Sequence, residues 1–175
     1  RAWKVVRQEE KFYLVSLNKH IVWPHATEML GQHSKECTTK NYTSANCECG
    51  LYAYEDSQMV HGLARSAILG SVSLWGTVYK YTNGYRSQYG YPNKITDFRC
   101  IICQKIIPVD SPGAKTVILH NENSLPKNHA YFLCSCSEQS LAYIKTLLVG
   151  HFEIDEYDTK DVVESLNESY GLNSL

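Results

Sequence analysis

The sequence predicts an α+β fold: a curved, mostly antiparallel sheet or partial barrel with one helix, followed by a zinc-ribbon-like segment and two helices. Three observations support it. Short β-like runs separated by turn residues fill the first half of the 175-residue chain, Asn83-Gly84 lies between two such runs, and cysteines recur at metal-ligand spacing. The expected division is a β-rich module over residues 1–96 and a zinc-ribbon-like segment with helices over residues 97–175, with packing as a single domain left open.

Short strands are expected along the first half because runs of β-branched and aromatic residues alternate there with turn residues. The stretch His-Ile-Val-Trp is extended and ends at Pro24, because the residue before a proline is disfavoured in a helix. The expected strands cover residues 4–6, 12–17, 20–23 and 51–54.

A helix is expected after these strands, where the apolar period changes to three or four residues. Asp56 or Ser57 provides an N-cap, and Gly70 provides the residue that ends the helix. The apolar positions of this predicted helix are Met59, Val60, Leu63, Ala64 and Ile68.

Asn83-Gly84 predicts a β-hairpin, because a type I′ turn needs positive φ at both central positions and these residue types tolerate it. With Thr82 opposite Tyr85, the pairing continues to Val78 opposite Tyr89. One face then holds Leu74, Val78, Tyr89 and Tyr91, which are expected in the core, and the other holds Trp75, Thr77, Tyr79, Tyr81, Arg86 and Gln88.

The second face of the hairpin is the candidate ligand-binding surface. Its rings can stack on a flat ring, and its guanidinium and amide can hydrogen-bond to the edge of that ring or to a phosphate. The alternative is purely structural, since aromatic residues and cross-strand pairs also stabilise hairpins. The candidate ligand-binding residues are Trp75, Tyr79, Tyr81, Arg86 and Gln88.

Two helices are expected in the second half, after β-like stretches at residues 114–120 and 129–134. One begins in a capping-box pattern at Ser137 and ends at Gly150. The other covers residues 159–170 and ends at Gly171, with apolar positions Val162, Val163 and Leu166.

Seven cysteines indicate metal binding rather than a disulfide framework. An odd number leaves one cysteine over, and the N-terminal residues lack the apolar stretch of a signal peptide, which favours a reducing compartment. Cys100-x2-Cys103 and Cys134-x-Cys136 supply four thiolates, enough for one closed tetrahedral zinc site. A redox pair at Cys100 and Cys103 and buried free cysteines are the alternatives.

A second zinc site is expected around Cys37, Cys47 and Cys49. These cysteines need a fourth ligand, and His33 has the best spacing. One or two zinc ions are therefore expected per chain. A three-ligand site with an open catalytic position, and simple packing of the thiols, are the other interpretations. The alternative fourth ligands are His25 and His61.

Charge is distributed unevenly along the chain. Residues 1–99 contain 12 Lys and Arg against 8 Asp and Glu, a net charge of +4, whereas residues 100–175 contain 5 against 10, a net charge of −5. An anionic partner therefore has its better surface in the first half, although uneven solvated faces give the same numbers. No run of 18 apolar residues occurs, so a soluble, cytoplasmic protein without membrane attachment is expected.

Catalytic motifs are missing from the sequence. It contains no P-loop, G-x-S-x-G, H-E-x-x-H or G-x-G-x-x-G. His120-Asn121-Glu122 ahead of Cys134 partly matches the signature of nucleobase deaminases, but the Pro-Cys pair and the two-residue spacer between cysteines are absent. No catalytic residue is assigned, and an enzyme is less favoured than a binding protein.

Four short motifs resemble a pattern found in uncharacterised bacterial proteins. Residues 47–53 are similar to its C-x-C-G-[IL]-Y-A, residues 74–78 to L-W-G-x-V, and residues 84–86 to G-[YW]-R. Residues 89–92 are similar to Y-A-Y-P, with Gly90 in place of alanine. The resemblance implies that the strand at 51–54 and the hairpin belong to one recurring module, and it implies no activity.

The favoured function is a zinc-stabilised binding module for nucleic acid or a nucleotide, through the aromatic and arginine face of the first half. The alternative is a protein-interaction adaptor with purely structural zinc, whose partner contacts that face or the acidic residues 155–164. A third interpretation is a small zinc-dependent hydrolase or deaminase with an open zinc site.

Overall fold

A computed structural model describes residues 1–17, 21–34, 36–44, 46–56, 65–120, 128–137 and 153–172. Ten strands in these residues form one sheet, and the pairings between them are antiparallel. The helix α2 (Thr159–Tyr170) is the single α-helix of the described residues. A mostly antiparallel sheet with one helix, the coarse form of the predicted α+β fold, is therefore confirmed.

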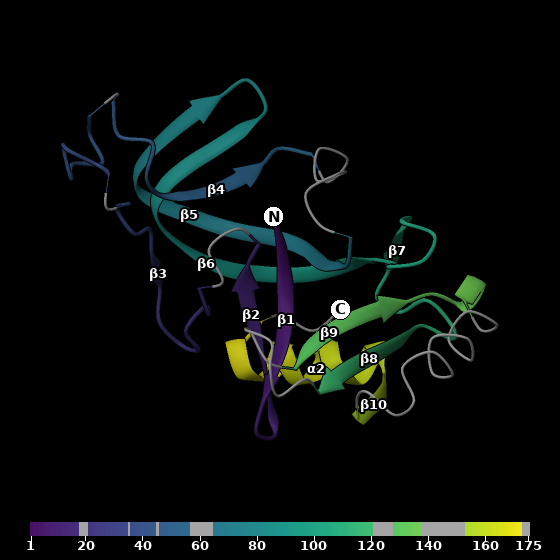
Figure 1. The fold of residues 1–175 in the computed structure, drawn as a ribbon. Coiled ribbons are helices and arrows are strands. Elements are labelled where there is room, and N and C mark those ends of the chain that lie inside the picture. The colour runs from purple at the N-terminus through teal and green to yellow at the C-terminus, as the bar shows by residue number, and fades with distance from the viewer. Residues whose placement is uncertain are drawn as a thin grey trace.

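The sheet is ordered β10-β8-β9-β1-β5-β6-β3, with β2 paired to β1 and both β4 and β7 paired to β6 (Figure 1). Neighbours in this order are often distant in sequence, so the fold depends on long-range pairing. The strands are β1 (Ala2–Gln8), β2 (Lys11–Ser16), β3 (Met29–Leu30), β4 (Leu51–Tyr54), β5 (Ala67–Tyr81), β6 (Gly84–Arg99), β7 (Ile106–Pro108), β8 (Lys115–His120), β9 (His129–Leu133) and β10 (Glu153–Asp158).

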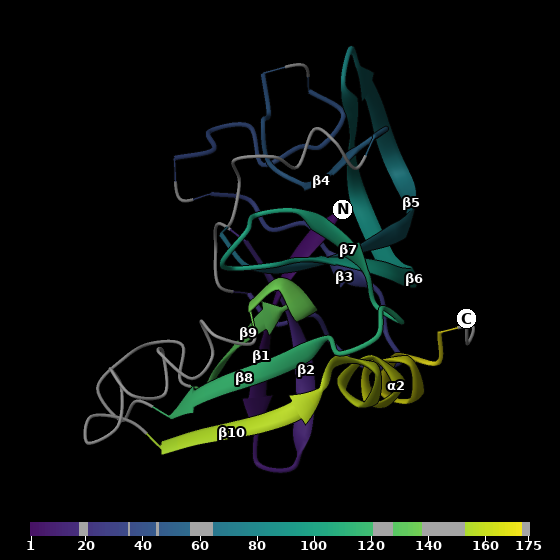
Figure 2. The same ribbon diagram turned by 90° about the vertical axis from the view of Figure 1, so that its right-hand side faces the viewer.

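The long β5–β6 hairpin joins two parts of the sheet. One end pairs with β1 and β7, and the other, at the turn, pairs with β4. The two views show the hairpin curving between these two parts (Figures 1 and 2). The register shifts at Leu69/Gly70, Ser71/Val72 and Trp75/Val78. Such irregularities bend a strand and increase its twist, which gives the hairpin its curvature.

The helix α2 closes one side of the core. Its apolar stripe is buried against β2, β6 and β8, and it ends as predicted at Gly171, whose φ of 60° lies in the left-handed region. The predicted helix over residues 159–170 is confirmed. No helix in the described ranges combines the length and hydrophobicity needed to cross a membrane. The buried side chains of α2 are Thr159, Val162, Val163, Leu166, Asn167 and Tyr170.

The first predicted helix is wrong over its C-terminal part, where Ile68 and Gly70 lie in strand β5. Ile68 is fully buried and pairs with Trp3 of β1 on one side and Phe98 of β6 on the other. A strand buried between two neighbours is apolar at consecutive positions, and so its sequence does not show the alternation that identifies a strand. The rest of this prediction, residues 57–64, lies outside the described residues.

Other predicted elements agree less completely. Within the predicted strand 20–23, Val22 forms only an isolated bridge with Val15. The predicted helix from Ser137 to Gly150 lies outside the described residues, apart from a 3-10 turn at Ser135–Ser137. Strand β10 was not predicted, because its alternating acids look like a solvated segment until β8 is known to pair with it.

The predicted hairpin exists, but its register is wrong by two positions. Tyr81 faces Gly84, so the turn residues are Thr82 and Asn83. Gly84 instead pairs with both neighbouring strands, and a Cβ there would lie 2.1 Å from the Ala53 carbonyl oxygen of β4. Glycine is therefore required by the close approach of β4, an interaction that local turn rules do not contain. Val78, expected in the core, is 44% exposed.

The predicted boundary between residues 96 and 97 falls inside β6, which runs without interruption from Gly84 to Arg99. The division into two modules stays a prediction.

Candidate metal centres

The four-cysteine cluster consists of the cysteines that spacing assigned to one site. Its sulfur atoms lie within 4.8 Å of one another, and the Cys103 and Cys134 sulfurs are 3.6 Å apart. No disulfide joins any of the seven cysteines. This arrangement is able to hold a metal ion. The members are Cys100, Cys103, Cys134 and Cys136.

A tight turn between β6 and β7 presents the first two sulfurs. The Gln104 N–H donates to the Cys100 carbonyl at 2.9 Å, and the Cys100 N–H donates to the Lys105 carbonyl at 3.0 Å. Gln104 has a φ of 61°, and its side-chain amide donates to the carbonyls of Ile101 at 2.6 Å and Arg65 at 3.0 Å. Sequence reasoning missed Gln104, because this left-handed position would ordinarily be assigned to glycine.

The other two sulfurs come from the end of β9. Cys134 directly follows that strand, and the 3-10 turn Ser135–Ser137 brings Cys136 back toward it. The Ile101 N–H donates to the Phe132 carbonyl at 2.9 Å, which ties the two cysteine-bearing segments together. Segments about 30 residues apart in sequence therefore meet at this cluster.

The four thiols differ in their ease of ionisation. Burial raises the pKa of Cys134. Burial also tends to raise the pKa of Cys103. Hydrogen bonds from the Lys105 N–H and the neighbouring thiols outweigh this effect and lower the pKa of Cys103 to about 7. A metal ion would compensate for the burial of charged thiolates, because thiolate is the form that coordinates.

The histidine-containing cluster is the second candidate centre. The His33 Nδ1 lies 3.4 Å from the Cys37 sulfur and 3.6 Å from the Cys47 sulfur, and those two sulfurs are 3.7 Å apart. All four ligand atoms lie within 4.8 Å of one another. His33 thus occupies the predicted place of the fourth ligand. The members are His33, Cys37, Cys47 and Cys49.

Of the two alternative histidines, His25 lies elsewhere in the structure. His25 stacks on Tyr13 with ring centroids 4.5 Å apart and packs edge-on against Tyr170. His61 lies outside the described residues.

The segment 31–50 that bears the histidine-containing cluster has no helix or strand among its described residues. A few hydrogen bonds attach it to the β5–β6 hairpin: the Gly31 N–H donates to the Gln88 carbonyl at 2.8 Å, and the Tyr79 hydroxyl donates to the Thr43 carbonyl at 2.6 Å. The Ser34 N–H donates to the Cys49 sulfur at 3.1 Å. A bound metal would add the cross-link that this segment otherwise lacks.

Ionisation is also uneven in the histidine-containing cluster. A hydrogen bond from Thr39 is the largest cause that lowers the pKa of Cys37 to about 6, and His33 and Cys47 add to it. Burial raises the pKa of Cys47. Tyr42, whose ring lies 4.1 Å from that of His33, has its pKa raised by burial and by the nearby sulfurs.

The predicted ligand-binding residues do not form one face. Trp75 lies opposite Tyr89 because of the bulge at residues 76–77, and their rings stack with centroids 6.3 Å apart. Gln88 is half-buried and donates to the Tyr89 hydroxyl at 3.3 Å. Arg86 is only 2% exposed. The structure thus places Trp75 on the other face from Tyr79, Tyr81 and Arg86.

Arg86 lies over the ring of Tyr79, with its guanidinium carbon 4.4 Å from the ring centroid. Its Nη1 is buried and has no hydrogen-bond partner among the described residues. Burial raises the pKa of Tyr52, and the neighbouring Arg86 guanidinium opposes that raise. Arg86 is therefore an internal charge flanked by tyrosines, and not an exposed contact for a phosphate.

Sequence reasoning missed two tyrosines of β4. Tyr52 pairs with Arg86 and Tyr54 pairs with Gly84, so both stand on the same face as Tyr79 and Tyr81. The alternation Leu-Tyr-Ala-Tyr shows that these two tyrosines share a face, but the pairing of β4 with β6 is needed to show which face.

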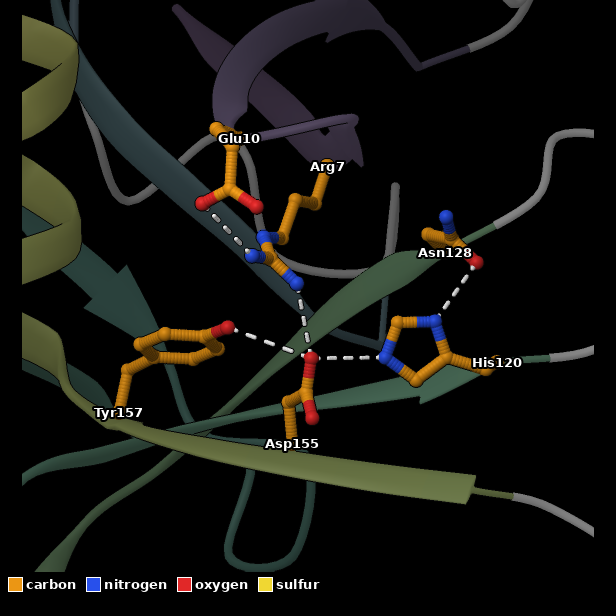
Figure 3. A network of polar contacts seen from close by, with 6 residues as sticks. All are labelled: Arg7, Glu10, His120, Asn128, Asp155 and Tyr157. Atoms are coloured by element: carbon orange, nitrogen blue, oxygen red, sulfur yellow. Dashed lines mark hydrogen bonds and ion pairs between the residues drawn. The ribbon is translucent and has the colours of Figure 1, made fainter.

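A polar network on β8 and β10 contains the histidine of the deaminase-like motif (Figure 3). Asp155 Oδ2 accepts hydrogen bonds from Arg7 and His120, both at 2.8 Å, and from Tyr157 at 3.2 Å. The other ring nitrogen of His120 lies 3.1 Å from the Asn128 side-chain oxygen. Neither imidazole nitrogen is thus directed at a cysteine, and the network links the ends of β1, β8, β9 and β10.

Comparisons with family models, with curated proteins and with solved structures found no match. The function is therefore inferred from the two metal clusters and from the surface of the β5–β6 hairpin.

Proposed function

We propose that this chain is a zinc-stabilised binding module whose ligand is nucleic acid. The observation that supports it best is the pair of four-residue clusters that could hold a metal ion, one within residues 33–49 and one between segments about 30 residues apart. The histidine-containing cluster ties together the irregular segment 31–50 directly before β4, and the four-cysteine cluster ties the β6–β7 turn to the end of β9. Both clusters are thus located where a cross-link stabilises the fold.

Zinc is the metal that these ligands favour. Sets of thiolates with one imidazole or none, at tetrahedral spacing, are typical of structural zinc sites. Four protein ligands leave no open position for a water molecule, whereas catalytic zinc keeps one. A reducing compartment such as the cytoplasm would keep the seven thiols available for coordination. Structural zinc is therefore proposed at both clusters.

Nucleic acid is proposed because the half of the chain with net charge +4 also presents exposed aromatic residues on the hairpin and on β4. Exposed rings provide stacking surfaces that accept any base, and positive charge attracts the phosphate backbone. The exposed aromatic residues of this region are Tyr52, Tyr54, Trp75 and Tyr81.

Two measurements test this proposal. Metal analysis of protein purified without added metal should give two zinc ions per chain. Fluorescence anisotropy with labelled single-stranded and double-stranded DNA and RNA at about 50 mM salt should show binding that weakens as salt rises. Absence of binding to every nucleic acid at low salt would overturn the ligand assignment in favour of a protein partner, and zinc-dependent turnover of a substrate would overturn the structural role of zinc.

A further inference from the structure

Four tyrosines form two rows across the adjacent strands β4, β6 and β5. In the first row Tyr52 and Tyr79 flank Arg86, and in the second row Tyr54 and Tyr81 flank Gly84. Directly paired residues in an antiparallel sheet project from the same face, as do residues two positions apart on β6. The two rows therefore lie side by side on one face near the turn of the hairpin, where β4 pairs with β6.

The rows differ in what stands between the two tyrosines. In the first row the flat guanidinium of Arg86 lies over the Tyr79 ring at 4.4 Å, and it is buried. In the second row glycine leaves the central position without a side chain. Tyr54 and Tyr81 flank that position and are 39% and 48% exposed. The first row thus contains its own flat group, while the second row lacks one.

We propose that the second row binds one unpaired nucleobase of a single-stranded nucleic acid, stacked between Tyr54 and Tyr81 above Gly84. The two tyrosine Cα atoms are separated by two strand spacings, about 10 Å. Rings that lean toward each other across this span can contact both faces of one flat ring, since stacked centroids lie roughly 4.5–7 Å apart. A base in a duplex is already stacked on its neighbours, so the site selects single strands.

The charge beside this row favours a base over a flat cation such as a guanidinium from a protein partner. Arg86 lies two residues along β6 from Gly84, about 7 Å away, and its Nη1 lacks a hydrogen-bond partner among the described residues. A second cation beside a buried guanidinium would be repelled. A base is neutral, so the buried guanidinium does not repel it.

This inference rests on the proposed function and deepens it, because it names the form of the nucleic acid and the residues that contact it. The test compares Tyr54→Ala and Tyr81→Ala with Tyr54→Phe and Tyr81→Phe, which keep the ring. Val78→Ala, an exposed position of the same hairpin, is the matched control. Fluorescence anisotropy measures binding to a labelled single-stranded 12-mer of mixed sequence, to its duplex and to an abasic strand of equal length.

Each alanine variant should bind the single strand about tenfold to a hundredfold more weakly, and each phenylalanine variant should stay within about threefold of the wild type. Binding to the abasic strand should be weaker and unaffected by these substitutions. Single-strand affinity that survives both alanine changes, or equal affinity for the abasic strand, would overturn the base site while leaving nucleic-acid binding intact. A wild-type protein that binds none of the three at low salt would overturn the proposed function itself.

Discussion

The hydroxyl group of Tyr170 donates a hydrogen bond to the carbonyl oxygen of Trp23 at 2.8 Å. The same hydroxyl accepts from the Leu14 N–H at 3.0 Å, and the Tyr170 carbonyl accepts from the Tyr91 hydroxyl at 2.9 Å. The last residue of α2 is thus bonded to the segment after β2, to β2 and to β6. Burial raises the pKa of Tyr170, so the hydroxyl keeps its proton and its role as a donor.

We therefore expect Tyr170→Phe to destabilise the fold by about 2–4 kcal/mol, because it leaves a buried N–H and a buried carbonyl without this partner. Urea unfolding followed by far-UV circular dichroism measures the change. Tyr81→Phe is the control, since its exposed hydroxyl should contribute less than about 0.5 kcal/mol. A loss below about 1 kcal/mol at Tyr170 would mean that water satisfies the two backbone groups.

Features determined by neighbours in sequence were predictable. Helix α2 combines a local apolar period with a glycine stop, and Leu51–Tyr54 is a short alternating strand. The two groups of residues that could hold a metal ion were also predictable from cysteine spacing, together with His33. In each case the residues that decide the structure lie within a few positions of one another or belong to residue types with few other roles.

Features that depend on distant strands were not predictable. The hairpin register depends on β4 approaching Gly84, and residues 67–69 form a strand because β1 and β6 flank them. The face formed by Tyr52, Tyr54 and Arg86 likewise needs a pairing that links residues about 30 positions apart. Local periodicity contains no information on such pairings, so the candidate base site emerged only from the structure.

Glycine-to-alanine substitutions should have different costs at Gly171 and Gly84. At Gly171 an added Cβ meets no atom within 4 Å. Gly171→Ala should therefore lower the free energy of unfolding only because alanine is less stable at a left-handed φ, by about 1–2 kcal/mol. At Gly84 the Cβ would meet the Ala53 carbonyl oxygen at 2.1 Å, so the strand β4 must move. Gly84→Ala should therefore lower the free energy of unfolding clearly more than Gly171→Ala does. It should also make the chain near β4 more susceptible to protease cleavage.

The comparison uses urea unfolding and limited proteolysis of both variants beside the wild type. Equal losses of stability at the two positions would show that β4 adjusts to the added methyl group without detaching.

The carboxylate of Asp155 should stabilise the fold at neutral pH. Its pKa is held below the ordinary value of 3.8, first by the hydrogen bond from His120, and Tyr157 and Arg7 act in the same direction. A folded pKa below the unfolded one means stability that is present above the unfolded pKa and is lost as pH falls through the folded pKa. Asp155→Asn should therefore be less stable than the wild type at about pH 5–7, and the difference should shrink as pH falls further below about 4.

The difference in urea midpoint between the two proteins measures this effect, with zinc content followed in parallel because acid also protonates thiolates. Asp110→Asn, which changes an exposed acid, is the matched control and should show no such difference. If the wild type and Asp155→Asn already have equal urea midpoints at about pH 6, the Asp155 carboxylate does not stabilise the fold.

Loss of one ligand should remove one zinc ion and leave the other. Cys47→Ser breaks the histidine-containing cluster and Cys103→Ser breaks the four-cysteine cluster, so each variant should contain one zinc ion per chain and the double variant none. Because structural zinc binding contributes directly to folding free energy, each single variant should unfold at a clearly lower temperature than the wild type.

Atomic emission spectrometry and thermal unfolding measure both effects. Glu48→Gln and Ser135→Ala are the controls, since these exposed residues lie between two ligands of each cluster without belonging to it.

The clusters also predict different local consequences. Cys47→Ser should loosen the segment 31–50 and increase proteolysis within it, whereas Cys103→Ser should leave that segment protected. Two zinc ions retained in either cysteine variant would exclude that cluster as a metal site, and zinc lost without a change in unfolding temperature would exclude a structural role for the metal.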